Sequence, residues 1–165
     1  MNAYEQVKEF HDQFAPSSNS IPNALNPEHA VFRAMFKIEE IVEFLHAASN
    51  GDHKLLLQMT EKIKSSIDDS VNKIKRQQKT ETPLVGEVDA LIDLLYFTYG
   101  SFVLMGVNPD PIFNLVHQAN MGKLFPDGKP HYDPDTNKVL KPDDWEKNYA
   151  PEEKILQELE RQKNM

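Results

Sequence analysis

The sequence contains no cysteine, and this absence excludes several kinds of chemistry at once. Disulfide bonds, thiolate metal sites and a cysteine nucleophile all require the thiol group. A chain without disulfides fits a reducing compartment, so we expect a cytoplasmic protein. The first fifteen residues have no apolar run and carry Glu5, Glu9 and Asp12, so they do not predict a secretory signal.

Positive charge is also scarce. The 165 residues include 18 Lys and Arg against 26 Asp and Glu, which gives a formal net charge of -8. Proteins that bind the phosphate backbone of nucleic acids usually present a broad basic surface, so we expect no nucleic-acid partner. To bind a smaller polyanion, the protein would need a local positive charge, such as a divalent cation held by carboxylates.

A long uninterrupted apolar run is missing as well. The longest apolar stretch, residues 84–107, is interrupted by Glu87, Asp89 and Asp93. The remainder is too short for a membrane span, so we expect no membrane partner and interpret this stretch as a buried helix.

Apolar residues recur at helical spacing along most of the chain, which predicts an all-α fold. Asn26-Pro27 indicates the start of the second helix. Asn50-Gly51-Asp52 indicates that this helix ends and a third one begins. Pro83 indicates the start of a fourth helix. Shorter helices are expected at 1–14 and 111–121. We expect one domain over residues 1–165, with a helical core at 27–121, a mostly irregular segment at 122–150 and a last helix at 151–163.

Two of the expected helices indicate how the core should pack. The helix that starts at Pro83 is apolar on nearly every side, so it should be the central one. The third helix should face inward along one apolar stripe. The fold class is therefore an all-α bundle of about four core helices with a long irregular segment near the C-terminus. The stripe of the third helix consists of Leu56, Met59, Ile63, Ile67, Val71 and Ile74.

Three glutamates fall within about one turn of the second helix: Glu39, Glu40 and Glu43. The i, i+3 pair Glu40 and Glu43 points the same way. A solvated polar face is the simple alternative, but Phe32 and Phe36 share this arc. Because an unpaired carboxylate is costly to bury, we favour a functional cluster.

Two aspartates lie on the apolar fourth helix. Asp89 and Asp93 are i, i+4 neighbours, and two acids close together in apolar surroundings cannot both stay ionised without a cation nearby. A hard metal ion with oxygen ligands would supply that cation. We therefore predict that Glu40, Glu43, Asp89 and Asp93 hold Mg²⁺, or alternatively Mn²⁺.

Other interpretations of these acids are open. They could form ion pairs with Arg33, Lys37 or a lysine of the third helix. A di-iron site would need a second Glu-x-x-His unit besides the one that ends at His46, and the sequence has none. A calcium loop that begins at Asp133 would need glycine where Lys138 stands, so turn formation explains that loop better.

The order of three motifs resembles the MazG-like all-alpha NTP pyrophosphatases. A further stretch, from residue 127 to residue 142, is similar to the phosphoribosyl-ATP pyrophosphohydrolase-like branch of that superfamily. The resemblance spans residues 31–145, and several ordered motifs are more specific than any single one. The three motifs are Glu39-Glu40-x-x-Glu43, Asp89-Ala-Leu-Ile-Asp93-Leu-Leu-Tyr96 and His117-Gln-Ala-Asn120-Met-Gly-Lys123-Leu.

The resemblance implies that the chain cleaves a nucleoside triphosphate between its α and β phosphates, releasing a monophosphate and pyrophosphate. It implies metal ligands at Glu40 and Glu43. The second motif of the family is usually Glu-x-x-Asp, and neither Asp89 nor Asp93 has glutamate three positions before it. We therefore assign these two aspartates only as the acidic residues that come nearest to the acids of the family's second motif. Members of the family commonly form dimers or dimers of dimers, so we expect a homodimer or homotetramer.

The roles of the candidate catalytic residues follow from phosphoryl-transfer chemistry. This chemistry requires the protein mainly to position the reacting groups and to neutralise their charge. The carboxylate-held metal would contact phosphate oxygens and lower the pKa of a water molecule. Glu39 would orient that water or take its proton. The predicted catalytic residues are therefore Glu39, Glu40 and Glu43.

The candidate substrate contacts lie mainly beyond the predicted core. Lys123 and Lys141 would contact the triphosphate and Asn120 a phosphate or the sugar, although a solvated surface lysine is the common alternative. Tyr96 or Trp145 would stack on the base, unless they are a core residue and a loop anchor.

Two alternative functions are kept. The chain could be a dedicated dUTP or dCTP hydrolase with the same metal chemistry and a different base pocket. It could also be a non-catalytic helical interaction module in which the acids form ion pairs. An interaction module has no need for four acids on two apolar helices, so we favour the enzyme.

Overall fold

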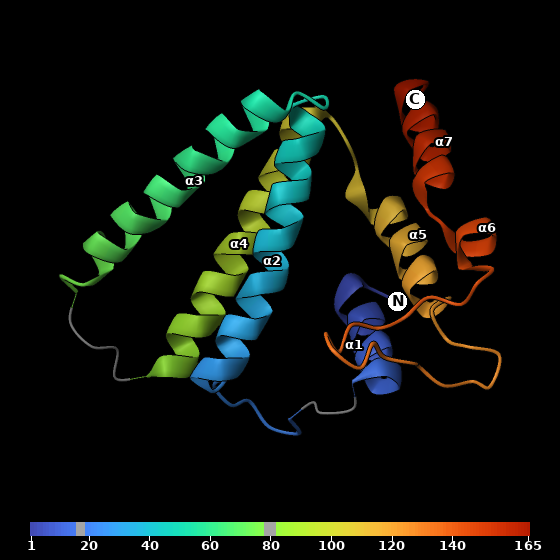
Figure 1. Cartoon of the computed structure of the whole chain (residues 1–165), viewed down its shortest axis with the longest axis horizontal. Helices are drawn as coiled ribbons and strands as arrows, with labels where there is room; N and C mark the ends of the chain where they lie inside the picture. Colours follow the sequence, from blue (N-terminus) through green and yellow to red (C-terminus); the bar gives the residue numbers. More distant parts are fainter. Residues whose placement is uncertain (16–18, 78–81) are drawn as a thin grey trace. The chain divides into compact units, whose positions relative to one another are not determined.

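The computed structural model describes residues 1–15, 19–77 and 82–165. Over these ranges the chain is helical, with no β-strand and one isolated bridge between Tyr132 and Val139. The predicted all-α fold class is confirmed. Figure 1 shows the helices, which are α1 (Ala3–Phe14), α2 (Pro27–Ala48), α3 (His53–Ile74), α4 (Pro83–Met105), α5 (Pro109–Met121), α6 (Trp145–Tyr149) and α7 (Glu152–Lys163).

Side-chain caps mark the starts of four described helices. The side chains of Asn2, Asn26, Asp52 and Asn108 accept hydrogen bonds from backbone N–H groups in the first turn of the helix that follows. The predicted starts of α2 and α3 are confirmed. Helix α5 begins at Pro109, two residues before the predicted position, because Asn108 is its cap and proline is suited to the first helical position.

The chain divides into two compact units, which are described separately below. Unit 1 comprises Met1–Ile21 and Ala90–Met165, and unit 2 comprises Pro22–Asp89. The division falls within α4, so its first residues belong to unit 2 and the rest to unit 1.

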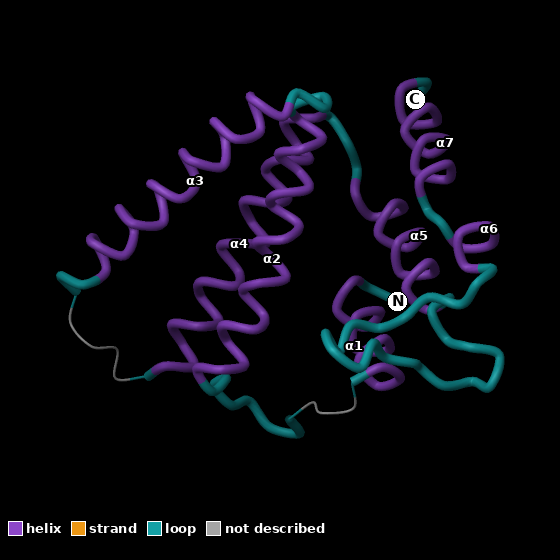
Figure 2. Tube along the Cα trace, in the orientation of Figure 1, coloured by secondary structure: helices purple, strands orange, loops and turns teal. Residues whose placement is uncertain are grey.

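The core of unit 1 surrounds α5, which packs against α1 and α7. Phe14, Ala119 and Trp145 are its buried apolar residues. The indole N–H of Trp145 donates a 2.8 Å hydrogen bond to the carbonyl oxygen of Ala119, and the Tyr132 hydroxyl donates to the carbonyl oxygen of Phe14. These bonds attach the segment 122–150, which runs mostly as a loop in Figure 2, to α5 and α1.

Unit 2 consists of α2, α3 and the start of α4, and α2 contacts α3. Leu45 is its one buried apolar residue among those described. Most other large apolar side chains of the unit face solvent, so the unit has little core of its own. The exposed ones include Val31, Phe32, Met35, Ile38, Val42, Phe44, Leu55, Leu57, Ile63, Ile67, Val71, Ile74, Val85 and Val88.

Two expectations about packing are wrong for the single chain. The apolar stripe of α3 does not face inward, and α4 is not a buried central helix, since neither helix has a buried residue. The apolar pattern shows that a face needs to be covered, but it does not show which surface covers it.

Helix α4 also has the length and composition of a membrane-spanning helix, with a mean hydropathy of 1.4 over an 18-residue window. Core helices of soluble proteins meet the same criteria, and Asp89 and Asp93 both lie within α4. These properties alone therefore do not establish a membrane protein.

We predict that Trp145→Phe lowers the free energy of unfolding by about 1–2 kcal/mol, because the Ala119 carbonyl in the last turn of α5 loses its indole donor. Urea denaturation followed by circular dichroism at 222 nm measures the change. Tyr4→Phe, at a side chain 77% exposed, is the control and should leave the midpoint unchanged. An unchanged midpoint for Trp145→Phe would show that this bond does not hold the loop.

Candidate functional site

The three candidate glutamates of α2 are all exposed. Glu40 and Glu43 lie three residues apart and so share one side of the helix. Neither of these two forms a hydrogen bond or ion pair with a described residue. Their carboxylates are therefore available to a cation.

The candidate side chains of α4 are exposed as well. Asp89 and Asp93 face solvent, and Tyr96 is 76% exposed. The expectation that apolar surroundings hold the two aspartates is therefore wrong for the single chain. Neither aspartate has an ion-pair or hydrogen-bond partner in the part of the chain that the structure describes.

The described residues show no ion pair between these acids and basic side chains, which was the alternative interpretation. Lys37 donates to the backbone carbonyl of Arg33 at 3.0 Å, and burial followed by the nearby Arg33 charge lowers the pKa of Lys37. On α3, Lys64 pairs with Glu61 at 2.6 Å. Among the described residues, no basic side chain forms an ion pair with Glu40, Glu43, Asp89 or Asp93.

A metal site is not assembled in the described residues. No group of three or more His, Asp or Glu side chains within 1–15, 19–77 and 82–165 is placed to hold a metal ion. Three of the predicted ligands belong to unit 2, whereas Asp93 belongs to unit 1. The chemistry of the donors does fit Mg²⁺, since four carboxylates without cationic partners are hard oxygen ligands. The four-carboxylate site stays a prediction.

Near these acids, Glu87 has a structural contact. Its carboxylate accepts a 2.9 Å hydrogen bond from the backbone N–H of Leu25, in the segment before α2. This bond connects the start of α4 to the start of α2 within unit 2.

Two residues that were predicted to contact the substrate lie next to each other at the end of α5. The Lys123 ammonium donates a 2.7 Å hydrogen bond to the side-chain oxygen of Asn120, and both residues are half-buried. An amide and an ammonium at one helix end can both donate to an anion. The structure therefore brings this predicted pair together.

Lys141 lies over the ring of Trp145, with its ammonium 3.8 Å from the ring centroid, and it pairs with Glu146 at 3.3 Å. Trp145 itself is only 5% exposed and its indole N–H is bound to Ala119. Trp145 is therefore the loop anchor, and the expectation that it stacks on a base is wrong because its ring is covered.

The loop at Asp133 is held by its own hydrogen bonds. The Asp133 carboxylate accepts from the backbone N–H groups of Asp135 and Thr136 and from the Thr136 hydroxyl, at 3.1, 2.7 and 2.8 Å. The bond from the Thr136 hydroxyl is the main cause that lowers the pKa of Asp133. This is turn geometry, as expected, rather than a calcium loop.

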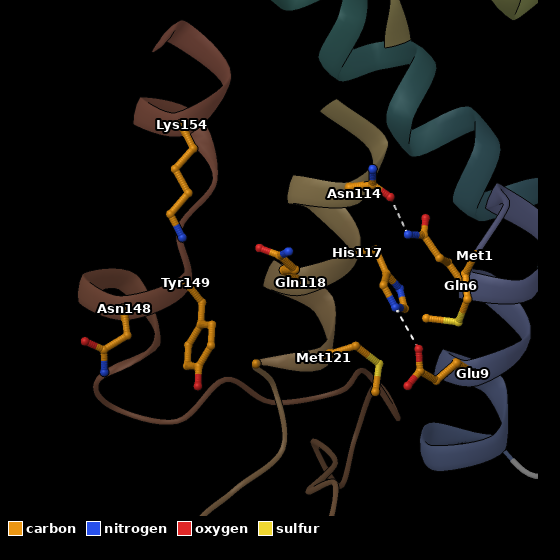
Figure 3. A pocket seen from close by; sticks show the side chains of 11 residues that line it. Met1, Gln6, Glu9, Asn114, His117, Gln118, Met121, Asn148, Tyr149 and Lys154 are labelled. Carbon is orange, nitrogen blue, oxygen red and sulfur yellow. Dashed lines mark hydrogen bonds and ion pairs between the residues drawn. The ribbon is translucent and has the colours of Figure 1, made fainter. Parts of the chain in front are cut away.

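Unit 1 also contains a cavity of about 720 Å³ that the sequence did not predict (Figure 3). On one wall, His117 Nε2 lies 3.1 Å from a carboxylate oxygen of Glu9, and the Gln6 amide donates to the side-chain oxygen of Asn114. These pairs join α1 to α5. The other lining residues are Met1, Gln118, Met121, Gly122, Asn148, Tyr149 and Lys154.

A glycine positions the opposite wall of this cavity. A Cβ at Gly122 would lie 2.3 Å from Cγ of the Tyr149 ring, which is closer than real contacts allow. Residue 122 must therefore lack a side chain for Tyr149 to occupy this position. The requirement is steric, because the φ of Gly122 is −65°.

Comparisons with known proteins agree in sequence and in fold. Residues 7–120 match the family described as phosphoribosyl-ATP pyrophosphohydrolase. A crystal structure of a candidate NTP pyrophosphohydrolase from Exiguobacterium sp. 255-15 is similar, with 40% sequence identity and a TM-score of 0.89, covering 99% of this chain and 97% of that chain. No curated protein matches the chain. The family match includes every candidate carboxylate and Asn120, and it ends before Lys123 and Lys141.

We predict that Glu9→Ala loosens α1 from α5, because His117 loses its carboxylate partner. A lost hydrogen bond of about 1 kcal/mol corresponds to roughly fivefold faster local opening. Hydrogen exchange of the α1 amides measures this opening. Gln13→Ala, at an exposed position of the same helix, is the control. Equal exchange rates in the two variants would show that the Glu9–His117 pair does not hold α1.

Proposed function

Because the chain belongs to the phosphoribosyl-ATP pyrophosphohydrolase family, within the MazG-like all-alpha NTP pyrophosphatases, we propose that it is a Mg²⁺-dependent nucleoside triphosphate pyrophosphohydrolase. Hydrolysis of a pyrophosphate bond is the activity of the family. The Mg²⁺ dependence and the cleavage of ribo- or deoxyribonucleoside triphosphates to monophosphate and pyrophosphate are our proposal. Mn²⁺ is the alternative metal.

The observation that carries the proposal is the set of four carboxylates without cationic partners. Glu40, Glu43, Asp89 and Asp93 form no ion pair with a described residue, although the family match covers all four. Acids left without partners are suited to a bound divalent cation. When bound, Mg²⁺ would neutralise phosphate charge and lower the pKa of a water molecule.

The remaining steps use residues of the chain. Glu39 would orient a water molecule toward the α phosphorus and accept its proton. The new bond joins the water oxygen to the α phosphorus as the bond to the α–β bridging oxygen breaks, so pyrophosphate leaves. Lys123, Lys141 and Asn120 would donate to phosphate oxygens, and the exposed ring of Tyr96 would contact the base.

We predict that Glu43→Gln lowers pyrophosphate release at least about 100-fold, since even outer partners of metal ligands cost about 10- to 100-fold when they are removed. The assay uses a panel of NTPs and dNTPs with Mg²⁺, with and without EDTA. Glu61→Gln on α3, where the glutamate pairs with Lys64, is the matched control and should keep full activity.

The same panel separates the proposal from its alternatives. Turnover confined to dUTP or dCTP would indicate a dedicated hydrolase. No turnover of any nucleotide by the wild-type chain would favour a non-catalytic helical module. Full activity of Glu43→Gln, with unchanged circular dichroism, would remove Glu43 from the site.

We also propose that a second copy of the chain covers the exposed faces of α2 and α4 in a homodimer, or in a homotetramer of two such dimers. Phe32, Met35 and Val85 are 46%, 65% and 63% exposed, and the one buried apolar residue found among the described residues of unit 2 cannot stabilise the unit alone. A partner copy supplies a matching apolar surface by symmetry. A cytoplasmic location fits this arrangement, in which protein rather than lipid covers α4.

We predict that the chain behaves as a dimer or tetramer of the 19.0 kDa protomer in light scattering without detergent. Met35→Lys should lower the mass toward that of the protomer, because a lysine would be buried unpaired in the interface. His29→Lys, at an exposed position of the same helix, is the control. A protomer mass for the wild-type chain, or a need for detergent, would contradict this assembly.

A further inference from the structure

The cavity of unit 1 has a volume in the range of small-molecule sites. Its volume of about 720 Å³ falls within the roughly 300–1,000 Å³ typical of ligand pockets. Helices α1, α5, α6 and α7 all contribute to its wall, so residues far apart in sequence converge on one space. None of the predicted catalytic residues lines it.

The wall formed by α1 and α5 is fixed by polar contacts. Gln6 and His117 are 7% and 9% exposed, and they are bound to Asn114 and Glu9 respectively. Side chains whose hydrogen bonds are satisfied hold their positions before a ligand arrives. This wall is therefore preorganised.

A second group of polar side chains in the lining has no partner among the described residues. These are the Gln118 carboxamide, the Tyr149 hydroxyl and the Lys154 ammonium. Figure 3 shows Lys154 extending from α7 toward Tyr149, while Gln118 faces them from α5. Gly122 holds the Tyr149 ring in place by leaving room for it.

The composition of the lining restricts the kind of ligand. The carboxamides, together with one carboxylate, disfavour a purely apolar ligand. A single lysine opposite Glu9 is too little charge for a polyphosphate. The lining holds one carboxylate and one histidine, Glu9 and His117, and these are bound to each other, which disfavours a metal ion. What remains is a polar ligand with at most one anionic group.

We propose that this cavity binds the nucleoside portion of a nucleotide, with Lys154 contacting its phosphate. The Gln118 carboxamide carries a donor and an acceptor on one planar group, which matches the edges of nucleobases. An aromatic ring such as Tyr149 offers a face for a base. The identification as a nucleotide rests on the proposed function, which yields a nucleoside monophosphate.

Binding of nucleoside monophosphates in the presence of EDTA tests this inference without turnover or metal. Isothermal titration calorimetry with AMP, GMP, CMP, UMP and dTMP should show saturable binding of at least one of them. Gln118→Ala and Lys154→Ala should each raise Kd about tenfold, since each removes a hydrogen bond to the ligand. Gln157→Ala on α7 and Lys73→Ala on α3 lie outside the cavity lining and should leave Kd unchanged.

Parallel hydrolysis assays show whether the bound nucleotide is the substrate or product of the reaction or a separate effector. If KM for the triphosphate rises with the same factor as Kd in Gln118→Ala, the bound nucleotide is the substrate or product. If KM stays constant while Kd rises, the cavity binds a nucleotide as a separate effector. Both results support a nucleoside site in this cavity.

Two further results separate this inference from the proposed function. Monophosphate binding without hydrolysis of any triphosphate would overturn the proposed function and leave the cavity site standing. Hydrolysis without saturable monophosphate binding, or with the same Kd in all four folded variants, would overturn the cavity site.

Discussion

A hydrogen bond from the first residue of α6 to the end of α5 organises the better-packed unit of this chain. Trp145 donates to the Ala119 carbonyl, and the Lys141 ammonium covers the indole ring. Through these contacts the 122–150 segment returns to the end of α5, next to Asn120 and Lys123. Three candidate phosphate contacts are thereby attached to one helix end, and the same contacts place α6 and Tyr149 at the edge of the cavity.

The two units divide the proposed chemistry between them. Unit 2 carries Glu39, Glu40, Glu43 and Asp89, acids on helices with little core. Unit 1 carries the cationic and carboxamide side chains that suit phosphate and nucleoside groups. In the proposed mechanism the acids would hold the metal ion and the cationic side chains would contact the negatively charged substrate.

Local signals in the sequence predicted the helices well, because capping depends on residues close together in the chain. Asn26 and Asp52 marked the starts of α2 and α3. Packing was less predictable, since the apolar surface of α4 was interpreted as a buried centre and is exposed in the single chain. The pairs that line the cavity were missed because Glu9 and His117 are 108 residues apart, and no local pattern indicates such a contact.

The uncovered apolar surface of α2 and α3 has a consequence for the life of the protein in a cell. A newly made copy presents Val31, Met35 and Ile74 to its surroundings until another surface covers them. Chaperones and proteases recognise such surface in incompletely assembled chains. If the proposed dimer forms, abundance would follow the rate at which subunits meet, because unpaired copies would be degraded and paired copies would persist.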